Sequence, residues 1–271
     1  MKVLIIFIFL LQHSVFAGFE QTNLGSRANA IGGAFVGLSD DCWSIFYNPA
    51  GLSLINFNEA AVYYSPRPFG LSELSTTAFA ANYSTKIGTL AFAAKKYGFD
   101  LYKEISGTLS YANLFLGINI GTSFHIHTLT IKGYGNDYTI GVDIGIMFPL
   151  AYNLLFGFSA KNINAPTIGK MKEKLPQVFS FGTSYSPINN LFLLMDYEKE
   201  IMFDGSLKAG FEYWIFEFAA LRLGVNEKPS TISGGLGLKY SSMKIDYAII
   251  SHQELELTHS ITIGFLWGER K

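Results

Sequence analysis

The sequence is poor in cysteine, in charged residues and in long apolar runs, and each shortage excludes a class of protein. A single cysteine, Cys42, rules out an internal disulfide and a cysteine-based zinc cluster. Charged residues make up 15% of the 271 residues, against roughly 25% in an ordinary soluble domain. The net charge of −1 offers no basic surface to nucleic acid, so nucleic acid is excluded as a partner.

The longest apolar run is Val3–Leu11, close to the start of the chain. Lys2 precedes it, and the small residue Ala17 follows shortly before Gly18, which is the pattern of a secretory signal peptide cleaved after Ala17. The alternative is a membrane-anchoring helix, which needs about 20 apolar residues, and the polar residues 12–14 interrupt the run too early. We expect residues 1–17 to be a signal peptide and no later stretch to span a bilayer as a helix.

Apolar residues are abundant, at 49% of the chain, with 24 Phe and 27 Gly. An exported, apolar chain without a spanning helix has one remaining way to cross lipid, because only helices and closed barrels satisfy every backbone polar group there. After residue 57 the sequence breaks into short segments of alternating polarity, as membrane barrels do. We count fourteen: 58–65, 76–84, 88–97, 102–111, 114–127, 137–149, 154–162, 177–186, 191–199, 205–215, 218–226, 231–240, 243–251 and 257–267.

The connections between these segments alternate between tight and long. The turn at 112–113 is one of the tight ones, whereas 66–75, 128–136, 163–176 and 252–256 are longer and more polar. Outer-membrane barrels have short periplasmic turns and long extracellular loops, whereas a soluble β-sandwich, the alternative, needs no such asymmetry. We therefore predict an all-β fold, a 14-stranded antiparallel transmembrane β-barrel over residues 57–271. It would cross the lipid of the bacterial outer membrane as a multi-pass protein, with both termini periplasmic.

Charged residues in the segments occupy the face opposite the apolar side chains. Basic side chains facing lipid at mid-depth cost about 2–4 kcal/mol, so this face is expected to line the barrel lumen. Both signs are present in similar number, which favours ion pairs that brace the wall over a substrate relay. The residues are Asp143, Lys161, Asp196, Glu198, Lys208, Glu212, Arg222, Lys239, Lys244 and Asp246.

Residues 18–56 differ from everything that follows them. Ser26–Leu38 is expected to form a short helix or two broken turns, since Gly32 and Gly33 weaken a continuous helix. Asn48 followed by Pro49 is a helix-start signal, and Gly51 is expected to end that turn at once. The segment is too irregular to span lipid and too apolar for the periplasm. We therefore predict that residues 18–56 form an N-terminal plug, or hatch, inside the barrel.

The stretch "GSRANAIGGAFVGLSDDCWSIFYNPAGLS" resembles the N-terminal signature of the PorV/PorQ family of outer-membrane proteins. The matching residues are Arg27-Ala28, Ile31-Gly32-Gly33-Ala34-Phe35, Asp40-Asp41 and Asn48-Pro49-Ala50-Gly51-Leu52. The close of the chain, with Asp246-Tyr247 and Thr258-His259, is similar to the family's final hairpin. The two blocks cover about a fifth of the chain. It is shorter than the type IX secretion members and ends in Gly268-Glu269-Arg270-Lys271 rather than on an aromatic residue.

That family resembles the long-chain fatty acid transporter (FadL) barrels, so the resemblance implies fourteen strands, a hatch and one of two functions. In the first, the barrel passes a hydrophobic small molecule across the outer membrane, and Phe35, Trp43, Phe46 and Tyr47 bind it; otherwise these aromatics only fix the plug to the wall. In the second, the barrel docks an exported or envelope protein in a type IX secretion-like complex. The loop with Lys170, Lys172, Glu173 and Lys174 would then carry the contacts. Arg27, Asp40, Asp41, Asn48 and Pro49 are assigned a structural role in the plug.

Other chemical motifs have simpler interpretations. The stretch 233–239, "SGGLGLK", lies inside an alternating segment and lacks the spacing of a phosphate loop. His125 and His127 share a strand face but have no evident acidic or thiol partner in the sequence, so we interpret them as polar wall residues and predict no metal. No nucleophile stands beside a base. We predict no cofactor, no catalytic residue and no enzyme activity.

Overall fold

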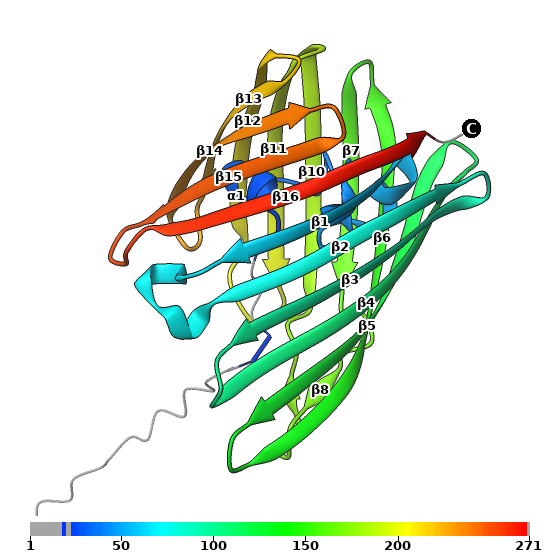
Figure 1. Ribbon diagram of the computed structural model, residues 1–271. Helices are drawn as coiled ribbons and strands as arrows, with labels where there is room; N and C mark the ends of the chain where they lie inside the picture. The colour runs from blue at the N-terminus through cyan, green and yellow to red at the C-terminus, as the bar shows by residue number, and fades with distance from the viewer. Residues whose placement is uncertain (1–17, 20–22, 270–271) are drawn as a thin grey trace, which may run out of the picture.

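The protein is a closed barrel of fourteen antiparallel strands in a computed structural model that describes residues 18–19 and 23–269 (Figure 1). The expected signal peptide therefore lies outside the described residues. Each strand pairs with its neighbours in the chain, and β1 closes the barrel against β16. The strands are β1 (Phe57–Ser65), β2 (Thr76–Thr85), β3 (Gly88–Gly98), β4 (Tyr102–Phe115), β5 (Ile118–Ile131), β6 (Gly135–Ala151), β7 (Leu154–Lys161), β10 (Val178–Ile188), β11 (Leu191–Glu200), β12 (Ser206–Phe216), β13 (Ala219–Asn226), β14 (Thr231–Tyr240), β15 (Met243–His252) and β16 (Thr258–Glu269).

All fourteen predicted strands are present, and the alternation along them divides the wall into two faces. On β14, Ile232, Leu236 and Leu238 are exposed on the outside, whereas Ser233 and Gly237 are buried toward the lumen. Strands β6 and β16 show the same pattern. The outer face is a continuous apolar surface, as lipid requires. Among the described residues, none of the helices has the length and apolarity needed to cross a membrane.

One turn lies four residues from its predicted place. The sequence suggested a turn at Ala112-Asn113, but β4 continues to Phe115 and pairs with β5 from Ile118 onward. The two-residue turn is Leu116-Gly117, with φ angles of 49° and 81°. Two positive φ angles are what a tight hairpin turn of the primed type needs, and glycine supplies the second without strain. Asn113 is a strand residue that pairs with Ile120.

The long connections gather at one end of the barrel, which we call the loop end, and the tight turns gather at the other, the turn end. Two connections at the loop end contain short elements that alternation did not reveal. One holds the 3-10 turns η3 (Pro68–Gly70) and η4 (Ser72–Leu74). The other holds a two-stranded hairpin, β8 (Thr167–Ile168) and β9 (Glu173–Lys174), outside the barrel sheet. Elements of two residues are too short to show a period of two.

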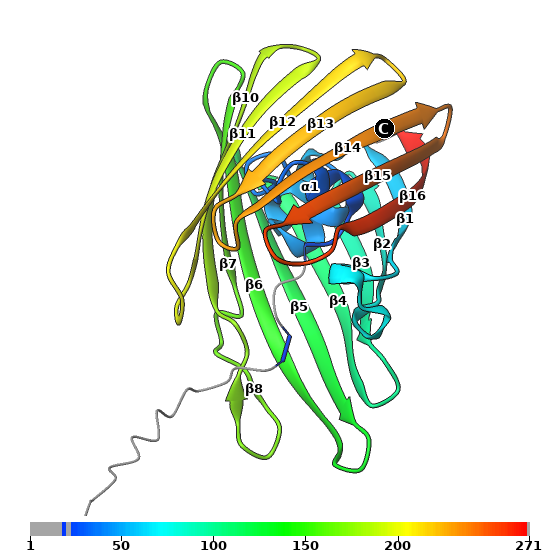
Figure 2. The same ribbon diagram turned by 90° about the vertical axis from the view of Figure 1, so that its left-hand side faces the viewer.

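Residues 23–56, here named the inner segment, lie inside the barrel (Figure 2). They form α1 (Ser26–Ala30) and the 3-10 helices η1 (Cys42–Phe46) and η2 (Pro49–Leu54). The predicted break after α1 is present, with Gly32 and Gly33 at φ angles of 70° and 76°. Gly51 does not end η2, because the turn runs on to Leu54. A β-carbon at Gly51 would lie under 3.0 Å from the Ser39 carbonyl oxygen, so its small size serves close packing instead.

The two ends of the described chain lie at opposite ends of the barrel. β16 finishes at the turn end, paired with the start of β1. Phe19 lies at the loop end, where it packs with Leu129, Ile168 and Leu175. The inner segment thus passes through the lumen from the loop end to the turn end before β1 begins, and the N-terminus named in the prediction of periplasmic termini lies outside the described residues.

Candidate functional site

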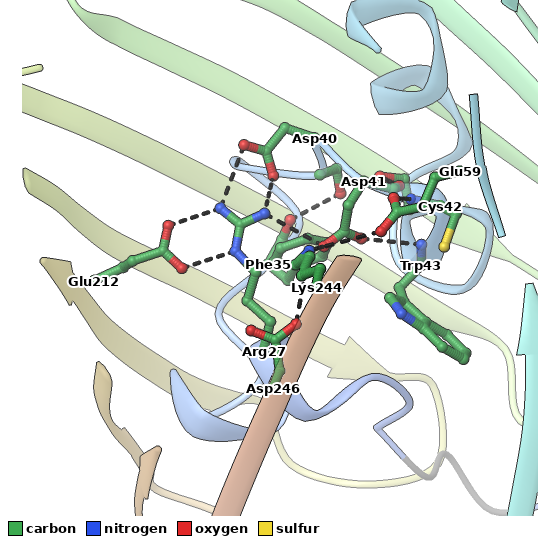
Figure 3. A network of polar contacts seen from close by, with 12 residues as sticks. Arg27, Phe35, Asp40, Asp41, Cys42, Trp43, Glu59, Glu212, Lys244 and Asp246 are labelled. Atoms are coloured by element: carbon green, nitrogen blue, oxygen red, sulfur yellow. Dashed lines mark hydrogen bonds and ion pairs between the residues drawn. The ribbon is translucent and has the colours of Figure 1, made fainter. Parts of the chain in front are cut away.

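The inner segment is held against the wall by a closed ring of alternating charges near the turn end of the lumen. Figure 3 shows the part of this ring around Arg27, Asp41 and Lys244. Arg27 of α1 starts the ring, with Nε 2.7 Å and Nη2 2.8 Å from the two carboxylate oxygens of Glu212 on β12. Glu212 also accepts a hydrogen bond from Arg222 Nε at 2.6 Å, and Arg222 Nη1 donates to Asp246 at 2.7 Å. The wall thus contributes charges from three different strands to this side of the ring.

Lys244 closes the ring on the other side. Its ammonium lies 3.7 Å from Asp246 and 3.3 Å from Asp41 of the inner segment. Asp41 in turn lies 3.3 Å from Arg27 Nη1. Three cations therefore alternate with three carboxylates, and the inner segment supplies one of each sign. Buried charges of this kind are tolerated only when they are paired, so the ring favours one position of the inner segment.

Two further carboxylates contact members of this charge ring. Asp40 accepts a 2.6 Å hydrogen bond from Arg27 Nη1, and its side chain is 38% exposed. Glu59 of β1 accepts from the Cys42 backbone amide at 2.9 Å and lies 3.8 Å from Lys244. Burial alone would raise the pKa of Asp41, but the charges of Lys244 and Arg27 outweigh it and hold that pKa below its usual value. Asp41 is therefore an anion at neutral pH, as its place in the ring requires.

Glycines on the wall let the backbone of the inner segment approach the strands directly. A β-carbon added to Gly224 on β13 would lie under 3.0 Å from the backbone of Ile31 and Gly32. A β-carbon added to Gly182 on β10 would likewise lie under 3.0 Å from the backbone nitrogen of Gly37. Beside it, the Asp196 carboxylate accepts a hydrogen bond from the Val36 amide at 2.8 Å. The same tight fit recurs around this side of the barrel at Gly121, Gly145, Gly157, Gly210 and Gly235. Only residues without a side chain leave the lumen wide enough here.

Asn48 and Pro49 attach the far end of the inner segment. The Asn48 side chain accepts from the Ala50 amide at 3.2 Å, which caps η2 as the sequence predicted. Its amide nitrogen donates to the carbonyl groups of Val36 at 3.1 Å and of Ile146 on β6 at 3.2 Å. One side chain thus joins two parts of the inner segment to the wall.

Above the inner segment, toward the loop end, lies a cavity of about 570 Å³ that we call the outer cavity. Its walls are largely apolar and aromatic, with Tyr63, Phe69, Leu74, Tyr97, Phe99 and Tyr102 among the lining residues. Asn29 of α1 is also part of its lining, and charges of both signs lie around it, from Glu73, Lys95, Glu104, Glu198, Lys208 and Lys228. Apolar walls combined with polar groups that can fix orientation are the usual form of a small-molecule site.

A second, smaller cavity of about 90 Å³, the inner cavity, lies between the inner segment and strands β4 to β6. His125 Nε2 lies 2.8 Å from Asp143, and the stacked ring of His127 lies 2.8 Å from Ser106 Oγ through Nδ1. Asn23 and Lys95 line both cavities, so these two residues separate them. Within the described part of the chain, no group of three or more His, Cys, Asp or Glu side chains has the geometry to hold a metal ion.

The aromatic residues proposed as ligand contacts fall into two pairs. Phe46 and Tyr47 line the inner cavity. Phe35 and Trp43 line neither cavity: Phe35 is fully buried beside Tyr47, and Trp43 is 2% exposed in a cluster with Leu24 and Tyr63. Sequence reasoning missed the outer cavity, because its lining comes from strands and loops spread over most of the chain. Tyr residues at the loop-end positions of inward faces are the signal that was available.

Comparison with solved structures finds the same fold in bacterial hydrocarbon channels. The monoaromatic hydrocarbon channel CymD matches with a TM-score of 0.70 and 11% identity, over 94% of this chain and 100% of that one. The Pseudomonas putida toluene transporter TodX matches with a TM-score of 0.65 and 10% identity, over 92% and 98% of the two chains. A Pseudomonas aeruginosa FadL homologue matches with a TM-score of 0.62 and 11% identity, over 92% and 99%. No family profile and no curated protein matches the sequence.

The chain has the FadL-like barrel fold. TM-scores of 0.62 to 0.70 over more than 90% of both chains establish this architecture. The closed fourteen-strand barrel with an apolar outer face is that of a bacterial outer-membrane protein.

Proposed function

We propose that this barrel passes a hydrophobic small molecule across the outer membrane, with the outer cavity as its entry site and the inner segment as a movable plug. The observation that carries the proposal is the outer cavity itself, about 570 Å³ in volume, placed at the loop end and with an apolar wall that includes the aromatic residues Tyr63, Phe69, Tyr97, Phe99 and Tyr102. Below it the inner segment fills the lumen. A molecule that enters from the loop end therefore reaches the turn end only if that segment moves.

The likeness to CymD and TodX, channels for monoaromatic hydrocarbons by their names, supports a ligand of that chemistry. The resemblance to the PorV/PorQ signature supports the same division into plug and barrel. Of the residues in this signature, Arg27, Asp40 and Asp41 form one charge cluster. Asn48 and Pro49 attach the far end of the inner segment to the wall. We therefore propose residues 18–56 as the plug and 57–271 as the barrel.

A docking role for an exported or envelope protein is the second candidate. The observation that favours it is the β8–β9 hairpin, whose tip presents Met171 at 87% exposure between Lys170 and Lys172. Capture of one defined exported protein that is lost when the tip is removed would support this role over transport.

Binding at the outer cavity is tested with the apolar fluorescent dye N-phenyl-1-naphthylamine on the purified protein. Replacing Tyr97 and Phe99 by Ala removes two aromatic walls, and we expect the dissociation constant to rise at least tenfold, about 1.4 kcal/mol. Trp43→Ala, in the core of the inner segment, serves as the comparison for a residue outside the cavity. Equal affinity in the wild type and the Tyr97/Phe99 variant would exclude the outer cavity as the binding site.

Movement of the plug is tested with a reversible lock. The hydroxyl oxygens of Ser26 on α1 and Thr262 on β16 lie 3.0 Å apart, so cysteines at both positions are placed to form a disulfide. In a Cys42→Ala background we expect the oxidised Ser26→Cys/Thr262→Cys variant to bind the dye normally but to stop toluene uptake by cells, and reduction to restore uptake. Each single-cysteine variant is the control. Full uptake through the locked protein would contradict a moving plug.

A further inference from the structure

The outward face of strands β3 to β6 has an apolar band at mid-height. Between this band and the loop end the surface is basic. At mid-height the exposed residues are Phe92, Leu109, Phe124 and Ile126, which face the lipid tails. Strands β4, β5 and β6 have 14, 14 and 17 residues and continue beyond this band toward the loop end. Whatever touches the outward face just above the band lies at the level of the lipid headgroups.

Three lysines form a diagonal row that starts at that level and runs toward the loop end. Lys96 on β3 is paired with Ile105, and Lys103 stands two residues from Ile105 on the same face of β4. Lys103 is paired with Thr130 of β5, and Lys132 follows two residues later, where its amide donates to the Leu101 carbonyl at 3.0 Å. Diagonal neighbours in a sheet lie roughly 7–8 Å apart. The row therefore presents three positive charges at close, regular spacing.

No carboxylate of the described chain forms an ion pair with these three lysines. The rest of the loop-end rim on this side of the barrel also has more lysines than carboxylates. Along residues 96–177 the rim and its loops carry six lysines against Asp100, Asp137 and Glu173; the lysines are Lys96, Lys103, Lys132, Lys170, Lys172 and Lys174. Along residues 199–257 the rim is acidic, with five carboxylates against Lys199 and Lys228; the carboxylates are Glu200, Asp204, Glu227, Glu254 and Glu256. The positive half is thus a local feature of a chain with net charge −1.

We propose that Lys96, Lys103 and Lys132 form a binding site for the phosphate groups of a phosphorylated glycolipid in the outer leaflet. Two observations carry this inference. The row starts just above the apolar band, where headgroups meet the wall, and runs from there toward the loop end, and its charge is complementary to phosphate. Lysine is a point-charge donor that suits phosphate without a fixed orientation, and basic clusters beside a membrane recognise anionic headgroups. The site is independent of the lumen and of the proposed transport.

The test measures lipid retention by native mass spectrometry of the full-length mature protein in detergent. The probe is a diphosphorylated, hexa-acylated glucosamine disaccharide, compared with the same glycolipid after removal of its phosphates. We expect the wild type to retain the phosphorylated form at least tenfold better. Lys96→Gln/Lys103→Gln/Lys132→Gln should remove that preference. The matched control, Lys199→Gln/Lys228→Gln on the acidic half of the rim, should keep it.

Heat-dependent gel mobility confirms that each variant is a folded barrel before the comparison is made. Equal retention of both glycolipids by the wild type, or full retention by the triple variant, would overturn the proposal. Complete displacement of the glycolipid by excess inorganic phosphate would also overturn it, by assigning the lysines to free phosphate. Retention of an acidic protein in place of the lipid, lost in the triple variant, would reassign the row to a protein partner.

Discussion

At the scale of single residues, Arg27 joins parts of the chain that lie far apart in the sequence. Its guanidinium binds Glu212, 185 residues away, through two hydrogen bonds and at the same time binds Asp40. The planar fork of arginine makes both pairs with one rigid group, which a lysine cannot do. The position of the inner segment therefore depends on this side chain and its partners together.

Replacement of Arg27 by Gln should loosen the inner segment, because Glu212 and Asp41 would lose a cation while remaining buried. Breaking a buried pair in this way costs about 3–5 kcal/mol. We expect faster hydrogen–deuterium exchange over residues 23–56 with unchanged exchange in the barrel strands. Arg27→Gln/Glu212→Gln, which removes both charges, should recover part of the protection. Equal protection in the wild type and Arg27→Gln would show that the ring does not hold the segment.

Asp41 gives the inner segment a dependence on pH with a defined sign. The charges of Lys244 and Arg27 hold the pKa of Asp41 in the folded protein below the usual value for an aspartate, so the charged form is stabilised by folding. That stabilisation is complete above about pH 5 and is lost as the pH falls through the lowered pKa. We expect exchange protection of residues 23–56 to fall below pH 4 in the wild type. The profile of Asp41→Asn, which keeps an acceptor for the Trp43 amide, should be flatter and lower at neutral pH.

The comparison with Asp41→Asn is needed because Asp40 titrates with the opposite sign. Burial raises the pKa of Asp40 in spite of the Arg27 charge, so the contribution of Asp40 is lost as the pH rises. Parallel profiles for the wild type and Asp41→Asn would remove Asp41 as the titrating group.

At the scale of elements, the sequence predicted the repeating strands, and it missed the features that have no repeating pattern. All fourteen strands follow from the alternation of apolar and polar residues, because each strand has one face in lipid and one in the lumen. The prediction misplaced the turn at Leu116-Gly117 because asparagine is common in turns. Asn113 nevertheless pairs with Ile120 as a strand residue. The charge ring was not predictable as a ring, since its members come together only when the barrel closes.

The wall glycines were visible in the sequence but were understood only from the structure. Gly224→Ala should push the backbone of Gly32 away from β13, because the added β-carbon lies under 3.0 Å from it. Gly234→Ala on the neighbouring strand is the control, since nothing lies nearer than 3.6 Å to its added carbon. We expect only Gly224→Ala to lose exchange protection in residues 23–56, with both variants folded. Similar behaviour of the two variants would mean that the tight fit at β13 is not what holds the segment.

At the scale of the whole molecule, the barrel and the inner segment differ in what stabilises them. The wall is a closed sheet with every strand paired on both sides and an apolar outer surface that lipid covers. The inner segment has no strand of its own and depends on the charge ring, the capped turn at Asn48 and close contacts at glycines. A closed barrel of this kind does not need the inner segment for its backbone hydrogen bonds, so the two parts are separable.

Deletion of residues 23–56 should therefore leave a folded barrel with an open lumen. We expect the deletion variant to keep the heat-dependent gel mobility of the intact protein and to show a much larger single-channel conductance in planar bilayers. The wall charges Glu212, Arg222, Lys244 and Asp246 would then line a hydrated passage and pair across it, so the increase should not depend on the sign of the ion. The oxidised Ser26→Cys/Thr262→Cys protein is the closed reference. A deletion variant that conducts no more than this reference would show that the strands themselves, rather than the inner segment, close the lumen.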